Sequence, residues 1–172
     1  MGFSFNFREV GSERDVREVI DFLASQPLGY PNYPDWVQRT EAELFSGYKQ
    51  AVLAYNEGTL VGDIVHQPHK YIPRVREIKN IRVHPDLRER GFARFMLRQV
   101  EVDARDGNEA VVVDTRKSND EMIEFLKRCG YFHLITVSLY DSTEEDITFI
   151  RPLTRREGLI ERVSADFVNN LR

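Results

Sequence analysis

Residues 83–93 combine the residue types that bind a phosphate group. Two arginines, Arg88 and Arg90, precede Gly91, and the apolar Phe92 follows it. The first turn of a helix leaves its backbone N–H groups without intrahelical partners, and the helix dipole is positive at that end. A glycine there lets the backbone approach an anion with no Cβ in the way. The spacing therefore predicts a pyrophosphate-binding loop that leads into a helix.

The elements on either side of this loop are predicted from periodicity. Residues 77–83 read as a strand, with Ile81 and Val83 on one face, and the apolar residues from Phe92 to about residue 102 recur at helical spacing. Gly107 ends this helix. Residues 110–113 form a continuous apolar run, which is typical of a strand buried on both faces. Strand, loop, helix and strand make a βαβ unit with two parallel strands.

Two other phosphate-binding motifs do not match the loop. A P-loop requires Gly-x-x-x-x-Gly-Lys-Ser/Thr, and the sequence contains no such run. A dinucleotide-binding fingerprint requires three glycines in Gly-x-Gly-x-x-Gly, and this loop has one. Neither motif therefore explains this loop.

The pattern Arg88-x-x-Gly91-x-Ala93 resembles the acyl-CoA pyrophosphate loop of the GNAT superfamily of N-acetyltransferases, which reads Gln/Arg-x-x-Gly-x-Gly/Ala. Residues 80–85 resemble the fourth strand of that family, and residues 119–131 resemble its fourth helix and the exit from it. The resemblance covers about residues 3–151. It implies an α/β (α+β) GNAT fold with a mixed central sheet of about six to seven strands, a splayed strand 4/strand 5 pair, and helices on both faces.

The remaining elements follow from local signals. Ser12 is placed to N-cap a helix. Further elements are expected as a strand over 3–9, a helix over 35–46, a hairpin of 50–55 with 59–66, and strands over 132–140 and 146–150. Residues 1–151 are expected to form the acetyltransferase domain. Residues 152–172 add a C-terminal helix that starts from a capping box, Thr154-x-x-Glu157, and packs on its own domain or at a homodimer interface.

Composition limits the class of protein. The chain has 172 residues, a formal net charge of −4 and one cysteine, Cys129, which rules out an internal disulfide. The negative charge argues against nucleic acid as a partner. No segment is long and apolar enough to span a membrane, and residues 1–10 lack the apolar core of a signal peptide. We therefore expect a cytoplasmic protein of ordinary globular composition.

The resemblance implies acetyl-CoA as co-substrate and a primary amine as acceptor, joined by direct attack in a ternary complex. The thioester oxygen would meet backbone N–H groups near Ile81 and Arg82, with the pantetheine arm placed as a pseudo-strand between strands 4 and 5. The residues implied in cofactor binding come from the strand, the loop and the fourth helix: Ile81, Arg82, Val83, Arg88, Glu89, Arg90, Gly91, Phe92, Ala93, Arg94, Asn119 and Phe125.

Glu77 is the candidate general base. It lies six residues before Val83, and a glutamate at the matching offset is the general base in the histone-acetyltransferase branch of the family. A carboxylate there can take the proton of the amine directly or through water. The alternative is a solvent-facing glutamate paired with a neighbouring arginine, since many members of the family use no dedicated base.

The general acid is where the chain departs from the family. Leu126 stands where many members have a tyrosine that protonates the departing thiolate, and leucine has no proton to donate. Tyr131, Tyr140 or water would replace it. Otherwise the chain binds acyl-CoA without transferring the acyl group, as a sensor or interaction module. Cys129, at the predicted helix end, is interpreted as a packing residue.

The acceptor site is expected at the loop that joins the first two helices. Tyr30, Tyr33 and Trp36 would form an aromatic wall for an apolar or cationic amine, and His66 would contact it from the end of a strand. An acidic turn over residues 141–146 would attract the amine. Each feature has a plain alternative, in packing or in a solvated turn. No third ligand accompanies the histidines, so no metal site is predicted.

Overall fold

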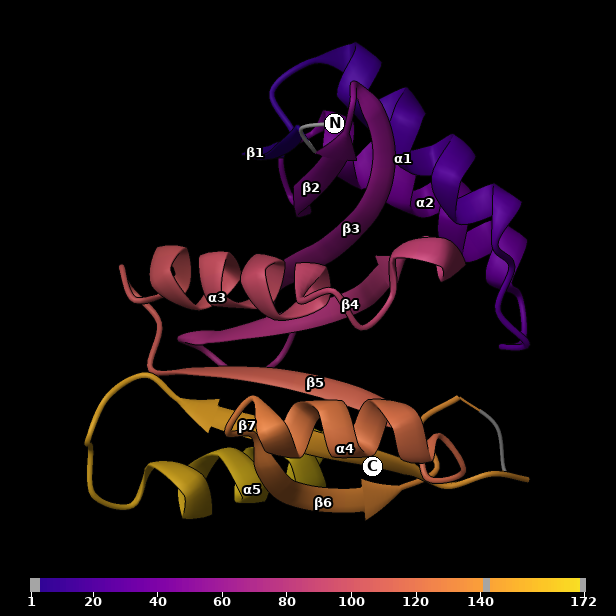
Figure 1. The fold of residues 1–172 in the computed structure, drawn as a ribbon. Coiled ribbons are helices and arrows are strands. Elements are labelled where there is room, and N and C mark those ends of the chain that lie inside the picture. The colour runs from indigo at the N-terminus through magenta and orange to yellow at the C-terminus, as the bar shows by residue number, and fades with distance from the viewer. Residues whose placement is uncertain (1–3, 141–142, 171–172) are drawn as a thin grey trace. The chain divides into compact units, whose positions relative to one another are not determined.

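The computed structural model describes residues 4–140 and 143–170. Within them the chain forms seven strands, five α-helices and one short 3₁₀ helix (Figure 1). The strands are β1 (Phe5–Glu9), β2 (Gln50–Asn56), β3 (Thr59–Pro68), β4 (Val75–Val83), β5 (Ala110–Arg116), β6 (Phe132–Val137) and β7 (Asp146–Pro152). The helices are α1 (Glu13–Ser25), α2 (Tyr33–Phe45), η1 (Pro85–Leu87), α3 (Phe92–Ala104), α4 (Asp120–Arg128) and α5 (Leu159–Asn170).

The strands form one mixed, open sheet in the order β1-β2-β3-β4-β5-β7-β6. Strands β4 and β5 are parallel and pair from Val75↔Ala110 to Ile78↔Val113, while β1–β2, β2–β3, β5–β7 and β6–β7 are antiparallel. The predicted fold class and the predicted βαβ unit are confirmed.

The chain divides into two compact units, residues 1–67 with 79–100 and residues 68–78 with 101–172. In the first unit, α1 and α2 cover the sheet face that carries Leu53 and Val65, with Val19 and Leu23 of α1 fully buried there. The opposite face meets α3. A Cβ on Gly62 would lie 2.9 Å from the Arg82 carbonyl oxygen, so this close approach of backbone requires glycine.

In the second unit, α5 packs on the sheet face that carries Ala110, Val112 and Ile150. Arg151 points to the other face, because it follows Ile150 along β7. There its guanidinium donates to the Cys129 carbonyl oxygen at 2.6 Å and pairs with Glu101 of α3 at 3.2 Å. Helices therefore lie on both faces of this part of the sheet.

The predicted cap at Ser12 is confirmed, and Asn119 caps α4 in the same way. Ser12 Oγ accepts from the Asp15 N–H at 3.2 Å, and Asn119 Oδ1 accepts from the Met122 N–H at 3.2 Å. The capping box at Thr154 is wrong, because α5 begins only at Leu159, after Gly158 in a left-handed conformation with φ of 70°.

Several predicted boundaries also shift. Helix α2 begins at Tyr33, two residues before the prediction, because Pro34 fits the first turn, where its missing N–H costs nothing. Strand β6 ends at Val137 rather than residue 140, and β5 continues three residues past the apolar run to Arg116. Strand β1 begins at Phe5, and Phe3 lies outside the described residues.

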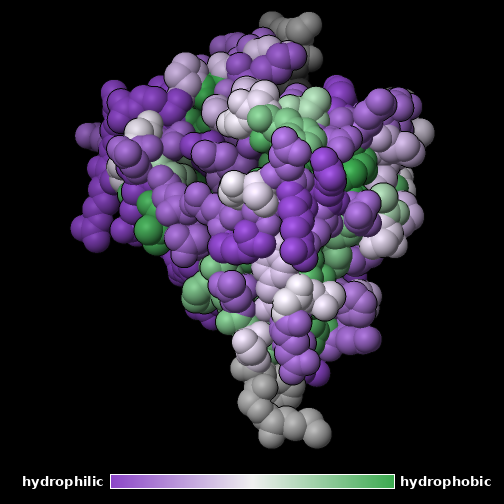
Figure 2. Space-filling view, turned by 90° about the horizontal axis from the view of Figure 1, so that it is seen from above, coloured by the Kyte–Doolittle hydropathy of each residue, from purple (hydrophilic) through white to green (hydrophobic). Residues whose placement is uncertain are grey.

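The surface is mainly hydrophilic in the view of Figure 2, where hydrophobic patches are interspersed among polar residues. Phe5 and Phe95 are among the exposed large apolar side chains, at 39% and 51% exposure. Among the described helices, none combines the length and apolarity that a membrane crossing requires.

Candidate active site

The predicted phosphate loop connects β4 to α3. After Val83 the chain makes the short helix η1, and two residues then take left-handed conformations, Glu89 with φ of 61° and Gly91 with φ of 86°. A Cβ built on Gly91 meets no atom within 4 Å, so open space lies beside the start of α3. The loop thus turns its backbone at the end of the helix where N–H groups have no intrahelical partner.

Exposed arginines surround this turn. Arg88, Arg90 and Arg94 all have exposed side chains, and the Arg88 Nε donates to the Val83 carbonyl oxygen at 3.4 Å. Guanidinium groups beside a helix N-terminus bind phosphate oxygens through charge-assisted hydrogen bonds. The residues present therefore fit a pyrophosphate group, and their role in cofactor binding stays a prediction.

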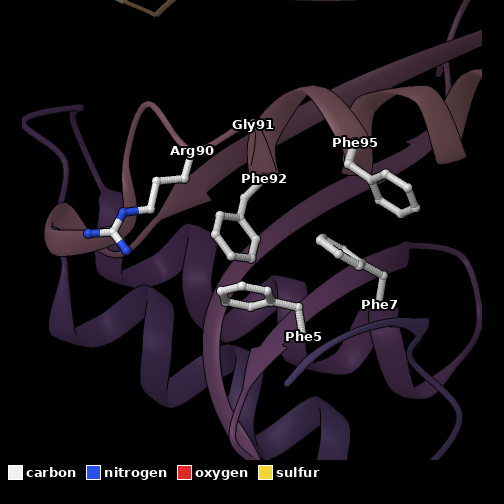
Figure 3. Close-up of a pocket in the computed structure, with 6 residues that line it drawn as sticks. All are labelled: Phe5, Phe7, Arg90, Gly91, Phe92 and Phe95. Atoms are coloured by element: carbon white, nitrogen blue, oxygen red, sulfur yellow. The ribbon is translucent and has the colours of Figure 1, made fainter. Parts of the chain in front are cut away.

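An aromatic pocket of about 450 Å³ adjoins the loop (Figure 3). Phe5 and Phe7 come from β1, Phe92 and Phe95 from α3, and Arg90 lies at its rim. The rings of Phe5 and Phe92 pack edge to face at 4.7 Å between centroids, and those of Phe7 and Phe95 are tilted at 4.2 Å. No local pattern in the sequence connects these four side chains, because β1 and α3 are more than 80 residues apart.

The predicted acceptor residues Tyr33 and Trp36 are stacked, with ring centroids 5.6 Å apart. Arg82 of β4, predicted for the cofactor, joins them: its guanidinium donates to the Tyr33 hydroxyl at 3.4 Å and to the Gln26 carbonyl oxygen. Burial raises the pKa of Tyr33, and the Arg82 charge partly offsets this rise. Tyr33 and Trp36 belong to the first turn of α2 rather than to the loop, whereas Tyr30 lies in the loop before α2 and is half-buried.

His66, a candidate contact for the acceptor, is buried. Its side chain is 4% exposed, at the end of β3, so it lies inside the first unit rather than on an open surface. Among the described residues there is no group of three or more His, Cys, Asp or Glu side chains that would hold a metal ion.

Asp63 on β3 and Asn80 on β4 form a buried polar pair that the sequence patterns do not predict. Asn80 Nδ2 donates to Asp63 Oδ2 at 2.6 Å, and the two residues are 0% and 6% exposed. Burial raises the pKa of Asp63 to about 7, against the opposing effects of the Asn80 hydrogen bond and the Arg82 charge. The signal in the sequence is an aspartate among the apolar residues Leu60, Val61, Ile64 and Val65 of β3.

Four further residues singled out by the sequence, Glu77, Asn119, Phe125 and Leu126, belong to the second unit. Glu77 is half-buried and stands in register with Val112 of β5. Asn119 is exposed and caps α4, Phe125 is half-buried, and Leu126 is 0% exposed. Leu126 therefore packs in the interior of this unit.

The two tyrosines considered as general acids differ in exposure. Tyr131 is 2% exposed, and burial, followed by the nearby Glu101 carboxylate, raises its pKa well above the usual range. Tyr140 is 42% exposed, and its hydroxyl donates to Asp114 Oδ2 at 2.7 Å. The structure thus favours packing for Tyr131 and leaves Tyr140 at the surface.

The acidic turn after β6 is largely paired. Glu145 binds Lys117 at 2.6 Å, and Glu144 lies 3.2 Å from both Arg116 and Ser118. Asp141 lies outside the described residues. Carboxylates that already have cationic partners are less available to attract an amine.

Comparison with known proteins identifies the class of protein that this fold and loop define. The model of the acetyltransferase (GNAT) family matches residues 16–131, more than half of the chain. The chain belongs to the GNAT acetyltransferase family. None of the curated proteins compared with the sequence matches it.

Solved structures share the fold at low sequence identity. An N-acetyltransferase from Staphylococcus aureus Mu50 has a TM-score of 0.74 and 16% identity, with 88% of this chain and 99% of that chain covered. The ribosomal-protein-S18-alanine N-acetyltransferase from Escherichia coli has a TM-score of 0.69 and 16% identity, covering 91% and 99%. An aminoglycoside 6'-N-acetyltransferase complexed with coenzyme A has a TM-score of 0.70 and 16% identity, covering 88% and 98%.

Proposed function

We propose that this protein is an N-acetyltransferase that moves an acetyl group from acetyl-CoA to a primary amine by direct attack in a ternary complex. The observation that carries the proposal is the loop before α3, where the turn at Gly91 lies among the exposed Arg88, Arg90 and Arg94. Family membership supports the same reading. Acetyl-CoA, when bound, supplies an activated acetyl thioester.

Each part of the chain has a role in this proposal. The loop and the first turn of α3 hold the pyrophosphate, and the backbone of Ile81 and Arg82 polarises the thioester carbonyl. Asn119 and Phe125 contact the pantetheine arm. Tyr30, Tyr33 and Trp36 form one wall of the acceptor site, since stacked aromatic rings favour an apolar or cationic amine.

Proton transfer needs an acceptor for the amine and a donor for the thiolate. Glu77 is the proposed acceptor, because a half-buried carboxylate on β4 can take a proton directly or through water. Tyr140 or solvent is the proposed donor, since Tyr131 is buried and Leu126 has no proton to give.

The alternative function is an acyl-CoA-binding sensor or interaction module. The observation that favours it is Leu126, which is 0% exposed and fills the position of the usual tyrosine. On this reading the protein binds acetyl-CoA and transfers nothing.

An amine screen separates the two functions. The purified protein is incubated with acetyl-CoA and, one at a time, spermidine, tyramine, kanamycin and a peptide with an N-terminal alanine. The release of free CoA thiol is measured over time, and the mass of each amine after the reaction is determined by mass spectrometry. Thiol release that depends on an amine, with an acetylated product, supports the transferase. Binding of acetyl-CoA with no product from any of the four amines supports the sensor.

A further inference from the structure

The loop of residues 27–32, where the acceptor site is proposed, has little packing of its own. Of its six residues only Tyr30 is half-buried, and the other five are exposed. A loop with so few buried side chains takes its position mainly from the elements at its two ends. Those ends are Gln26, directly after α1, and Tyr33, the first residue of α2.

One side chain from the sheet binds both ends of this loop. The half-buried Arg82 of β4 donates through Nη1 to the Gln26 carbonyl oxygen and through Nη2 to the Tyr33 hydroxyl, the latter at 3.4 Å. Its guanidinium also lies over the Tyr33 ring, 6.0 Å from the ring centroid. Arginine suits this bridge because its planar guanidinium presents several donors in fixed directions.

The bridge also completes the C-terminal end of α1. The last carbonyl groups of a helix have no intrahelical partners, and the helix dipole is negative there. The Tyr33 hydroxyl donates to the Leu23 carbonyl oxygen at 3.0 Å, and Arg82 supplies a positive charge that the last turn of α1 lacks. Arg82, Tyr33 and the end of α1 therefore form one hydrogen-bonded cluster.

This cluster continues into the aromatic wall proposed for the acceptor. The Tyr33 ring stacks on Trp36 at 5.6 Å between centroids, and the Lys49 ammonium lies 5.2 Å from the centroid of the Trp36 ring. Lys49 is buried and donates to the Thr40 hydroxyl at 2.8 Å, and its ammonium pairs with Glu43 at 2.6 Å. The wall is thus supported from β4 on the Tyr33 side and from the chain after α2 on the Trp36 side.

We propose that Arg82 is a positioning residue that sets the distance between the bound amine and the thioester. This inference rests on the proposed function, in which the backbone of Arg82 polarises the thioester carbonyl and Tyr30, Tyr33 and Trp36 hold the amine. The backbone and the side chain of one residue then locate both reactants. Attack requires the reacting atoms to lie about 3–3.5 Å apart, so a loop that moves away from β4 binds the amine less well in the reactive position.

The kinetic test removes the bridge from either side, in Arg82→Met and in Tyr33→Phe, which keeps the stacked ring. Arg39→Met and Tyr48→Phe are the matched controls, because Arg39 on α2 and Tyr48 after it are both exposed. In the amine screen described above, each bridge variant should raise the KM for the amine about tenfold or more. Its affinity for acetyl-CoA, measured by titration, should stay within about twofold of wild type, and both controls should match wild type.

Amide hydrogen exchange follows the loop without turnover. Exchange at residues 28–30 and 32 should be faster in both bridge variants than in wild type, while the amides of β3 keep the wild-type rates. The double variant should raise the KM for the amine by less than the product of the two single effects, because both changes break the same bridge.

Two results would overturn the inference. One is an unchanged KM for the amine in both bridge variants, whether or not they unfold at a lower temperature, which would leave Arg82 as a cap of α1 alone. The other is an equal loss of affinity for the amine and for acetyl-CoA, which would indicate a general change of the fold. In either case a wild type that acetylates an amine keeps the proposed function. If wild type acetylates none of the four amines, the proposed function fails and this inference fails with it.

Discussion

At the scale of single residues, two buried carboxylates show how environment sets chemistry. Glu109 is surrounded by the guanidinium groups of Arg156, Arg74 and Arg162, which hold its pKa below the usual range. Asp63 has one amide partner and a more distant arginine, and burial raises its pKa. Charge compensation therefore dominates at Glu109, and desolvation dominates at Asp63.

Asp63→Asn should stabilise the protein above neutral pH. The folded pKa of about 7 lies above that of an unfolded aspartate, so the folded state binds more protons between about pH 4 and pH 7. Wild-type stability therefore declines as the pH rises through this window. Asparagine does not titrate, so the free energy of unfolding of the variant should exceed that of wild type by about 1–4 kcal/mol at pH 8 and equal it near pH 4.

Urea unfolding at a series of pH values measures this difference. Asp21→Asn, on the exposed face of α1, should follow wild type within about 0.5 kcal/mol at every pH. A stability difference for Asp63→Asn that does not change with pH would show that Asp63 does not titrate in this window.

The sequence predicted some of these residues and not others. The loop was predicted because Arg88, Gly91 and Ala93 carry their spacing within one short segment. The Asp63–Asn80 pair was not, because its two members lie 17 residues apart on different strands and neither belongs to a motif. The burial of His66 and Tyr131 likewise depends on the packing of neighbouring elements, which no local pattern gives.

At the scale of elements, apolar packing and ion pairs both hold α5 on the second unit. Leu159, Val163 and Phe167 face the sheet, and the Phe167 ring meets His69 edge-on at 4.9 Å. Arg156, just before the helix, and Arg162, on its first turns, bind Glu109 at the start of β5. The helix therefore packs on the second unit along its length.

Glu109→Gln should loosen α5. The change leaves three arginines without their common carboxylate. We expect the free energy of unfolding to fall by about 1–3 kcal/mol at pH 7. This is less than for a wholly buried ion pair, because the arginines are partly exposed. The pKa of Glu109 is lowered in the folded protein, so this stabilisation is fully present above the pKa of an unfolded glutamate. It is lost as the pH falls through the lower pKa of the folded state.

The rates of amide hydrogen exchange in α5 measure this loss of stability. Glu157→Gln, at an exposed glutamate, is the control. Faster exchange in α5 for Glu109→Gln at pH 7 is the expected result. Equal exchange in both variants would show that apolar packing alone holds the helix.

Most elements were predictable because periodicity is a local property. The strand, loop, helix and strand around Gly91 follow from alternation, helical spacing and one apolar run, and the structure has them in that order. The start of α5 was mispredicted because a capping box at Thr154 competes with the left-handed turn at Gly158. Which residue begins a helix depends on backbone geometry that the sequence only partly determines.

At the scale of the whole molecule, a net charge of −4 coexists with a basic loop. Arg88, Arg90 and Arg94 are all exposed, so a polyanion that binds there gains electrostatic energy that salt can screen. The mixed sheet and the parallel β4–β5 pair were predictable from the sequence and its family resemblance, whereas the aromatic pocket beside the loop forms only where β1 meets α3.

Affinity for CoA should fall several-fold as the ionic strength rises from about 0.05 M to about 0.5 M. Arg90→Gln should bind more weakly at low salt and depend less on salt, because one screened interaction is gone. Arg17→Gln, on the exposed face of α1, is the control and should keep the wild-type dependence. A salt dependence that Arg90→Gln leaves unchanged would place the anion away from this loop.

Isothermal titration with acetyl-CoA tests the central claim most directly, using wild type, Gly91→Glu and Gly107→Glu. Both glycines have similar left-handed conformations, with φ of 86° and 84°, and open space around a built Cβ, so both variants carry the same backbone strain and added charge. We predict micromolar binding by wild type and Gly107→Glu, and loss of binding by a folded Gly91→Glu. Binding that survives in Gly91→Glu, or none by wild type, would contradict the assignment of this loop to the pyrophosphate.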